Sequence, residues 1–268
     1  MKNTLQNKMV FQVEGLHHSF FTKKKEETKV LEGIDFKVFE NEFVAIVGPS
    51  GCGKSTILNL MSGLLRPTEG SVRLRDKEMD TVHSSIGYIA QSDTLLPWRT
   101  VRKNVEVGLE IRGIDKTTRK QKSIELIKKA ELEGFEDAYP HELSGGMRKR
   151  VDIIKVLAVE PEIIFMDEPF ASLDVFTREI LQKYVLKVWS EDRRTIVFIT
   201  HDLTEAITLA DRIFILSQRP AKLKSTHCID LERPRDPEEL KFNPRFIELY
   251  EGIWKDLKSE VEMQVKEA

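Results

Sequence analysis

The sequence predicts an α/β fold with a parallel sheet at its centre. Short apolar runs recur along its 268 residues, and continuous apolar runs of this kind are typical of strands that are buried on both faces. Segments with helical periodicity separate several of these runs. A polar residue or a glycine-rich loop follows four of them, and in a parallel sheet the carboxyl ends of the strands meet at one ligand-binding edge.

Strands and helices alternate along the chain. The predicted strands are residues 43–47, 86–90, 163–166, 195–200 and 212–217. The predicted helices are residues 55–64, 144–158 and 175–189. The first four strands deliver to one edge, in chain order, a glycine-rich loop, Gln91, the pair Asp167 and Glu168, and His201. We therefore expect these groups to act on a single ligand.

The loop after the first strand has the pattern of a phosphate cradle. It reads Gly48, Pro49, Ser50, Gly51, Cys52, Gly53, Lys54, Ser55, Thr56. This fits G-x-x-x-x-G-K-[ST] between a strand and a helix, a context that a chance glycine turn would lack. The glycines let backbone N–H groups turn towards phosphate oxygens, and the following helix presents its positive end. Lys54 can reach the β- and γ-phosphates, Ser55 can ligate Mg²⁺, and Thr56 can add a phosphate contact.

The other three strand ends supply groups that phosphoryl transfer to water requires. Asp167 can hold the shell of Mg²⁺, and Glu168 can orient or deprotonate the attacking water. Gln91 can contact both metal and water, and His201 can donate to the γ-phosphate. A surface turn or a cap is the alternative for each residue alone. Nothing resembles the N-K-x-D element that binds guanine, so a stacked base, and hence ATP, is expected.

Composition excludes several other classes of protein. The formal net charge of −2 gives no strong field for nucleic acid. No apolar run approaches the roughly 18 residues that a membrane span needs, and the first ten residues lack the apolar core of a secretory signal. The two cysteines, Cys52 and Cys228, have no metal-binding spacing, and they indicate a reducing, cytoplasmic compartment.

Taken together, the motifs resemble those of the ATP-binding subunits of ABC transporters. The resemblance covers nearly the whole chain and rests on the 48–56 loop, Gln91, the sequence LSGGM at 143–147, IIFMDEP at 163–169, SLD at 172–174 and His201. It implies a P-loop NTPase fold, with a RecA-like core around the parallel sheet, a helical subdomain and a small antiparallel β subdomain. We expect a single ABC ATPase domain over 1–268. The core with its N-terminal antiparallel β part would occupy 1–96 and 160–217, the helical subdomain 97–159, and a C-terminal extension 218–268.

The resemblance also implies a homodimer in which two copies stack head to tail and enclose two ATP molecules. Ser144, Gly145 and Gly146 of one copy would face the γ-phosphate held by Lys54 of the other, and Asp174 would lie at the seam. Ser144 can cap its helix, and glycines permit close backbone approach. An ordinary capped helix is the alternative, but two glycines in the first turn cost roughly 1 kcal/mol each.

Adenine would stack on an aromatic residue near the N-terminus. Aligning the stretch FQVEGLHHSF places Phe20 there, with Phe21 as the alternate. A core aromatic is the competing interpretation. The chain also departs from the family in part: Met147 replaces the usual Gln, Asp152 stands where an apolar residue is usual, and Lys155 with Val156 replaces a common Arg-Ala pair.

Three stretches, 95–105, 141–150 and 219–237, resemble the nitrate, sulfonate and taurine importer branch. In the first, Leu95, Leu96 and Trp98 surround Pro97. An apolar cluster on a loop indicates a partner surface. The resemblance implies that the partners are two membrane-spanning permease subunits. The alternative is that these side chains fold under the helical subdomain.

The function that the resemblance implies is hydrolysis of ATP to power uptake of a small anion or organic solute through separate membrane subunits. The protein would lie peripherally on the cytoplasmic face of the membrane, and a solute-binding protein would take part indirectly. An importer of a thiamine-precursor-type pyrimidine remains open. A non-transport ABC ATPase would need a long coiled-coil insertion or tandem units, and LSGG argues against an unrelated phosphate-loop kinase.

Overall fold

The computed structural model describes residues 8–21, 23 and 26–267. Residues 1–7, part of the stretch that lacks a secretory apolar core, lie outside the described residues. The strands are β1 Met9–Phe21, β2 Glu27–Phe39, β3 Phe43–Val47, β4 Glu69–Leu74, β5 Lys77–Glu78, β6 Ile86–Ile89, β7 Ile163–Asp167, β8 Thr195–Thr200, β9 Arg212–Leu216 and β10 Leu223–Cys228. The helices are α1 Lys54–Met61, α2 Val101–Ile111, α3 Lys116–Lys129, α4 Gly145–Leu157, α5 Val175–Glu191, α6 Leu203–Leu209, α7 Pro237–Leu240 and α8 Pro244–Glu267, with a 3₁₀ turn at Pro140–Glu142.

A six-stranded sheet with the order β10-β9-β3-β8-β7-β6 forms the centre of the fold. Strands β9, β3, β8, β7 and β6 are parallel, and β10 pairs antiparallel with β9. These five parallel strands are the five predicted apolar runs, and β3 and β8 are buried along their whole length. The prediction of a parallel sheet buried on both faces is therefore confirmed. Because β10 joins this sheet, the sheet extends past residue 217, where we expected the core to end.

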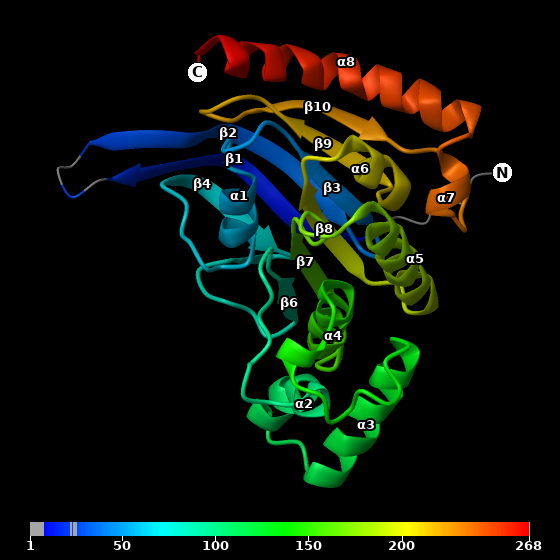
Figure 1. The fold of residues 1–268 in the computed structure, drawn as a ribbon. Helices are drawn as coiled ribbons and strands as arrows, with labels where there is room; N and C mark the ends of the chain where they lie inside the picture. Colours follow the sequence, from blue (N-terminus) through cyan, green and yellow to red (C-terminus); the bar gives the residue numbers. More distant parts are fainter. Residues whose placement is uncertain (1–7, 22, 24–25, 268) are drawn as a thin grey trace.

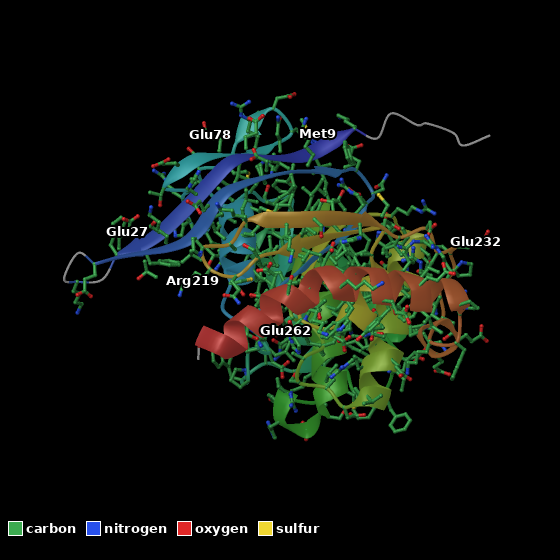
Figure 2. The ribbon with its side chains drawn as sticks, turned by 90° about the horizontal axis from the view of Figure 1, so that it is seen from above. Met9, Glu27, Glu78, Arg219, Glu232 and Glu262 are labelled. Atoms are coloured by element: carbon green, nitrogen blue, oxygen red, sulfur yellow. The ribbon has the colours of Figure 1, made fainter. Side chains whose placement is uncertain are left out.

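A second, antiparallel sheet with the order β2-β1-β4-β5 packs against the first. Alternate residues of β3 point to opposite faces: Val44 and Ile46 join the apolar cluster that includes β1, β2, β4 and α1, and the other three join the cluster of the remaining helices. The β1–β2 hairpin extends away from the rest of the molecule, and Glu27 on it lies at the opposite end of the molecule from Glu232 (Figures 1 and 2).

Helices α2, α3 and α4 pack on one another as a helical group, in which α2 and α3 lie at the far end of the molecule from α8 and α4 also packs on β6 (Figure 1). Each begins with a side-chain cap: Thr100, Asp115 and Ser144 accept hydrogen bonds from backbone N–H groups of the first turn. Such caps satisfy N–H groups that lack partners within the helix. In the described part of the chain, no helix has the length and apolar character that crossing a membrane requires.

Candidate functional site

The glycine-rich loop runs from the end of β3 to the first residue of α1. Gly53 begins the helix with a φ of +117°, a conformation that residues with a side chain rarely adopt. A Cβ at Gly53 would also lie 2.7 Å from Val30 Cγ1 on β2. The Lys54 side chain turns into the loop, and its Nζ donates to the carbonyls of Gly48 and Pro49, both at 2.9 Å. The loop therefore encloses a cation that is only 6% exposed.

Beside the loop, Ser55 and Asp167 bring oxygen atoms together. The Ser55 hydroxyl donates to Asp167 Oδ1 at 3.1 Å, and the Tyr88 hydroxyl donates to Asp167 Oδ2 at 3.3 Å. Burial raises the pKa of the Asp167 carboxyl, and the two hydroxyl donors act in the opposite direction. A hydroxyl and a carboxylate are ligands that Mg²⁺ accepts, so these residues fit the ion that the sequence predicts. Sequence reasoning missed Tyr88, whose ring belongs to an otherwise apolar strand.

The side chains of Gln91 and His201 converge on the carboxylate of Glu168. Gln91 Nε2 donates to Glu168 Oε2 at 3.3 Å, and His201 Nδ1 lies 3.2 Å from the same oxygen. The strand order β8-β7-β6 explains the convergence, because these residues follow three adjacent parallel strands. Glu168 has a φ of +43°, and a non-glycine residue held in this region stores about 1–3 kcal/mol of strain, commonly at functional sites.

The start of α4 presents the Ser-Gly-Gly sequence. Ser144 Oγ accepts a hydrogen bond from Met147 N at 3.2 Å, as the capping prediction requires. A Cβ at Gly146 would lie 2.5 Å from Thr177 Cγ2 on α5, whereas a Cβ at Gly145 would meet nothing closer than 3.8 Å. The close approach of α5 therefore gives Gly146 a packing reason within its own chain. The Met147 side chain packs against the core cluster that includes Phe43, Ala45 and Val47 of β3.

Asp174 caps α5 in the same way, accepting from Thr177 N at 3.1 Å. Four residues on, Arg178 donates from Nη2 to the carbonyl of Leu173 and from Nη1 to Asp202, both at 3.2 Å. One guanidinium thus joins the turn that carries Asp174 to the turn that carries His201. Sequence reasoning missed Arg178, because nothing local links α5 to the end of β8.

Phe20 lies on the β1–β2 hairpin with 43% of its surface exposed. It pairs with Thr28 on β2, two residues before the Val30 side chain that lies against Gly53. At about 3.3 Å per residue along a strand, this pairing lies about 7 Å along β2 from the contact with the loop. The Phe20 and His18 rings are nearly perpendicular, with their centroids 4.7 Å apart. Its role in adenine stacking stays a prediction.

The segment from Gln91 to Trp98 divides into two kinds of residue. Trp98 is 71% exposed, as the predicted partner surface requires. Leu95 is partly buried and packs against the same core cluster as Met147, which is the alternative stated for these apolar side chains. The role of the loop as a whole in binding a partner stays a prediction. The Leu96 backbone is held at both its N–H and its carbonyl by the Asn104 side chain.

The chain is similar to known proteins over nearly its whole length. The family described as ABC transporter matches residues 31–171. An ABC transporter ATP-binding protein of Methanocaldococcus jannaschii is 46% identical over 259 residues, which are 97% of this chain and 95% of that protein. The chain belongs to the ABC transporter family. A taurine import ATP-binding protein of Rhizobium johnstonii is 37% identical over 227 residues, 83% of this chain and 87% of that protein, and its name agrees with the resemblance to the importer branch.

Solved structures agree with this assignment. A dimeric ATP-binding cassette in a post-hydrolysis state, bound to ADP and Pi, superposes with a TM-score of 0.72 at 30% identity, over 83% of this chain and 100% of that one. This member of the ABC family is thus an ATP-binding protein and an ATPase with the P-loop NTPase fold. The range 31–171 includes the phosphate loop, Gln91, the Ser-Gly-Gly sequence and Asp167 with Glu168.

Proposed function

We propose that the chain is the ATP-hydrolysing subunit of an importer for a small anion or organic solute of the nitrate, sulfonate or taurine type. The similarity to a protein named for taurine import supports this cargo class. The observation that carries the catalytic part is the convergence of Gln91 and His201 on Glu168 Oε2. It lies next to the paired oxygens of Ser55 and Asp167.

In this proposal Glu168 accepts a proton from the attacking water, because its carboxylate is oriented from two sides. Gln91 and His201 fix that carboxylate, and His201 can use its second nitrogen to donate to the γ-phosphate. Lys54 would exchange its bonds to loop carbonyls for bonds to phosphate oxygens. Ser55, Gln91 and Asp167 would hold Mg²⁺, which neutralises charge on the transferred phosphate when it is bound.

The proposed assembly is a head-to-tail homodimer with two enclosed ATP molecules. The remaining loop residues, together with Phe20, Ser144, Gly145, Gly146 and Asp174, would complete each nucleotide site. Trp98 and its neighbours would meet two membrane-spanning permease subunits. An external solute-binding protein would deliver the solute to those subunits. The protein would then lie peripherally on the cytoplasmic face of the membrane.

Replacing Glu168 by Gln tests the catalytic proposal. The variant should bind ATP and form a stable dimer, while its turnover falls by about 10²–10⁴-fold, the usual contribution of general base catalysis. Glu162→Gln is the matched control, because Glu162 lies just before β7, at the other end of that strand, and pairs with Arg75 at the surface. Near-normal turnover in Glu168→Gln would refute the role of Glu168.

A further inference from the structure

The segment after β6 is fastened to one side of α4. Lys149 Nζ donates to the carbonyl of Ala90 at 2.7 Å and to the carbonyl of Gln91 at 3.3 Å. One residue earlier on the helix, Arg148 Nε donates to Asp93 Oδ2 at 2.9 Å. The Lys149 side chain is 2% exposed, so its bonds to the segment are sheltered from water.

A three-residue cluster continues this contact further along α4. The Thr94 hydroxyl donates to Asp152 Oδ1 at 2.5 Å, and Lys155 Nζ donates to the same oxygen at 2.7 Å. Lys155 Nζ also donates to the carbonyl of Thr94 at 3.0 Å. The Asp152 side chain is 1% exposed. Within the described part of the chain, no group donates a hydrogen bond to its Oδ2.

Asp152 and Lys155 form an ion pair at 2.7 Å whose carboxylate is almost completely buried. Burying a charged pair where an apolar residue would pack is a poor way to gain stability, because desolvation offsets the attraction. The pair is better explained by what it fixes, namely the position of Thr94. Residues 148, 149, 152 and 155 share one helical face because side chains three or four positions apart are neighbours. The whole face is used to hold residues 90–94.

We propose that Thr94, Asp152 and Lys155 are positioning residues that dock the 90–94 segment on α4 and so set the place of Gln91 beside Glu168. This inference rests on the proposed function, which gives Gln91 its role. The Asn104 side chain on α2 fixes the next part of the segment, at Leu96, so both halves are held by the helical group.

The paired variant Asp152→Ala/Lys155→Met tests the docking, because it removes both charges together and leaves neither buried alone. We expect backbone amides at 90–96 to exchange hydrogen at least about tenfold faster, because local opening becomes easier. We expect kcat to fall by at least about tenfold with little change in KM, because an interaction used after binding is lost. In a Gln91→Ala background, the same pair of changes should lower kcat no further, because the two act through one residue.

Arg150→Met is the matched control. Arg150 is a cation on the same helix, but it bonds to the carbonyl of Ala130 and to Glu131 instead, so exchange at 90–96 and kcat should stay at wild-type values. Thr94→Val is the second variant, because it deletes one hydroxyl and keeps the Asp152–Lys155 ion pair. Thr94→Val should also speed hydrogen exchange at 90–96 and lower kcat, but by less than the paired variant does.

Two results would overturn the inference. One is wild-type exchange at 90–96 in both the paired variant and Thr94→Val. The other is a loss of kcat that multiplies with the loss caused by Gln91→Ala. If Gln91→Ala alone left kcat unchanged, the proposed catalytic part of Gln91 would fail, while hydrogen exchange would still decide whether the cluster docks the segment.

Discussion

At the carboxyl edge of the sheet, Gln91 and His201 both contact Glu168 within a single chain. At the start of α4, by contrast, Ser144 bonds back to its own helix and Gly145 has room for a further atom. The first region brings together groups from three strands, and the second offers a helix N-terminus, whose N–H groups and dipole favour an anion. This difference is what the proposed shared site requires, in which the catalytic groups belong to one chain and the Ser-Gly-Gly sequence faces a second chain.

Mixing two inactive variants tests most directly whether each nucleotide site is shared between two chains. Lys54→Ala should lose ATP binding at its own loop, and Ser144→Arg should block the neighbour's site. Each variant alone should therefore be almost inactive. In an equal mixture, half of the dimers pair one of each and contain one intact composite site, so turnover should recover to at most about a quarter of wild type. Full-rate hydrolysis by isolated monomers would contradict the shared site.

The free energy of unfolding should also depend on the protonation of a buried carboxyl group near this edge, that of Glu205. Burial raises the pKa of Glu205 from 4.5 to about 7, against the effect of Thr200 and Arg178 beside it. A raised carboxyl pKa contributes stability that is complete below pH 4.5 and is lost as pH rises through about 7. Glu205→Gln should match wild type near pH 4.5 and exceed it at pH 8 by about 3 kcal/mol, at 1.36 kcal/mol per pKa unit.

Urea unfolding of wild type and Glu205→Gln at intervals from pH 4.5 to 8 measures this difference. Asp202 and Glu168 also act on Glu205 through their charges, so the comparison uses a substitution that alters no other group. Stability curves that stay parallel across the range would show that Glu205 keeps the same protonation in the folded and unfolded states.

The two glycines of the α4 start should respond differently to the same substitution. Gly146→Ala should lower the free energy of unfolding by about 1–3 kcal/mol, as overpacking does, because its Cβ would lie 2.5 Å from Thr177 Cγ2. Gly145→Ala should leave stability unchanged or raise it by up to about 1 kcal/mol, yet reduce turnover in the dimer. Thermal unfolding and ATPase rates together measure the contrast.

Thr177→Ser provides the control for the packing explanation, because it removes Cγ2 and keeps the hydroxyl. Combined with Gly146→Ala, it should restore most of the lost stability. An equal stability loss at Gly145 and Gly146 would show that helix geometry, and not contact with α5, determines both positions.

The smallest effect on the isolated protein is expected at Trp98. Trp98→Ala should leave ATP binding and basal hydrolysis near wild type, because the ring is 71% exposed, and should weaken capture of the subunit by permease-containing membranes. Leu95→Ala should instead destabilise the fold. The loss should be at most the about 2–5 kcal/mol of a fully buried leucine, because Leu95 is only partly buried in the core. Normal assembly of Trp98→Ala with the permease would remove this loop as the partner surface.

The parts of the fold and site that could be predicted are those that depend on local sequence. Runs such as 163–166 specify a buried strand, and the polar residue at its end follows from the direction of the strand. Ser144 and Asp174 could be predicted as caps because a cap acts within a few residues. Each of these features is encoded where it occurs.

The contacts that could not be predicted join residues far apart in sequence. Tyr88 reaches Asp167 only because β6 and β7 are adjacent, and Lys149 reaches Gln91 only because α4 packs beside the end of β6. The departures at Asp152 and Lys155 were visible, but their partner Thr94 was not. For Leu95, composition could not separate an outward-facing cluster from one folded inwards, because both put apolar residues on a loop.

Helix α8 runs beside β10, the strand that ends the six-stranded sheet (Figure 1). Glu260 accepts from Lys224 Nζ at 2.7 Å and from Gln218 N at 2.9 Å, and Asp256 lies 2.9 Å from His227 Nε2. An outermost strand leaves backbone groups free to pair with another chain, which is a common route to aggregation. A helix anchored by charged bonds along this strand restricts the approach of another chain to it.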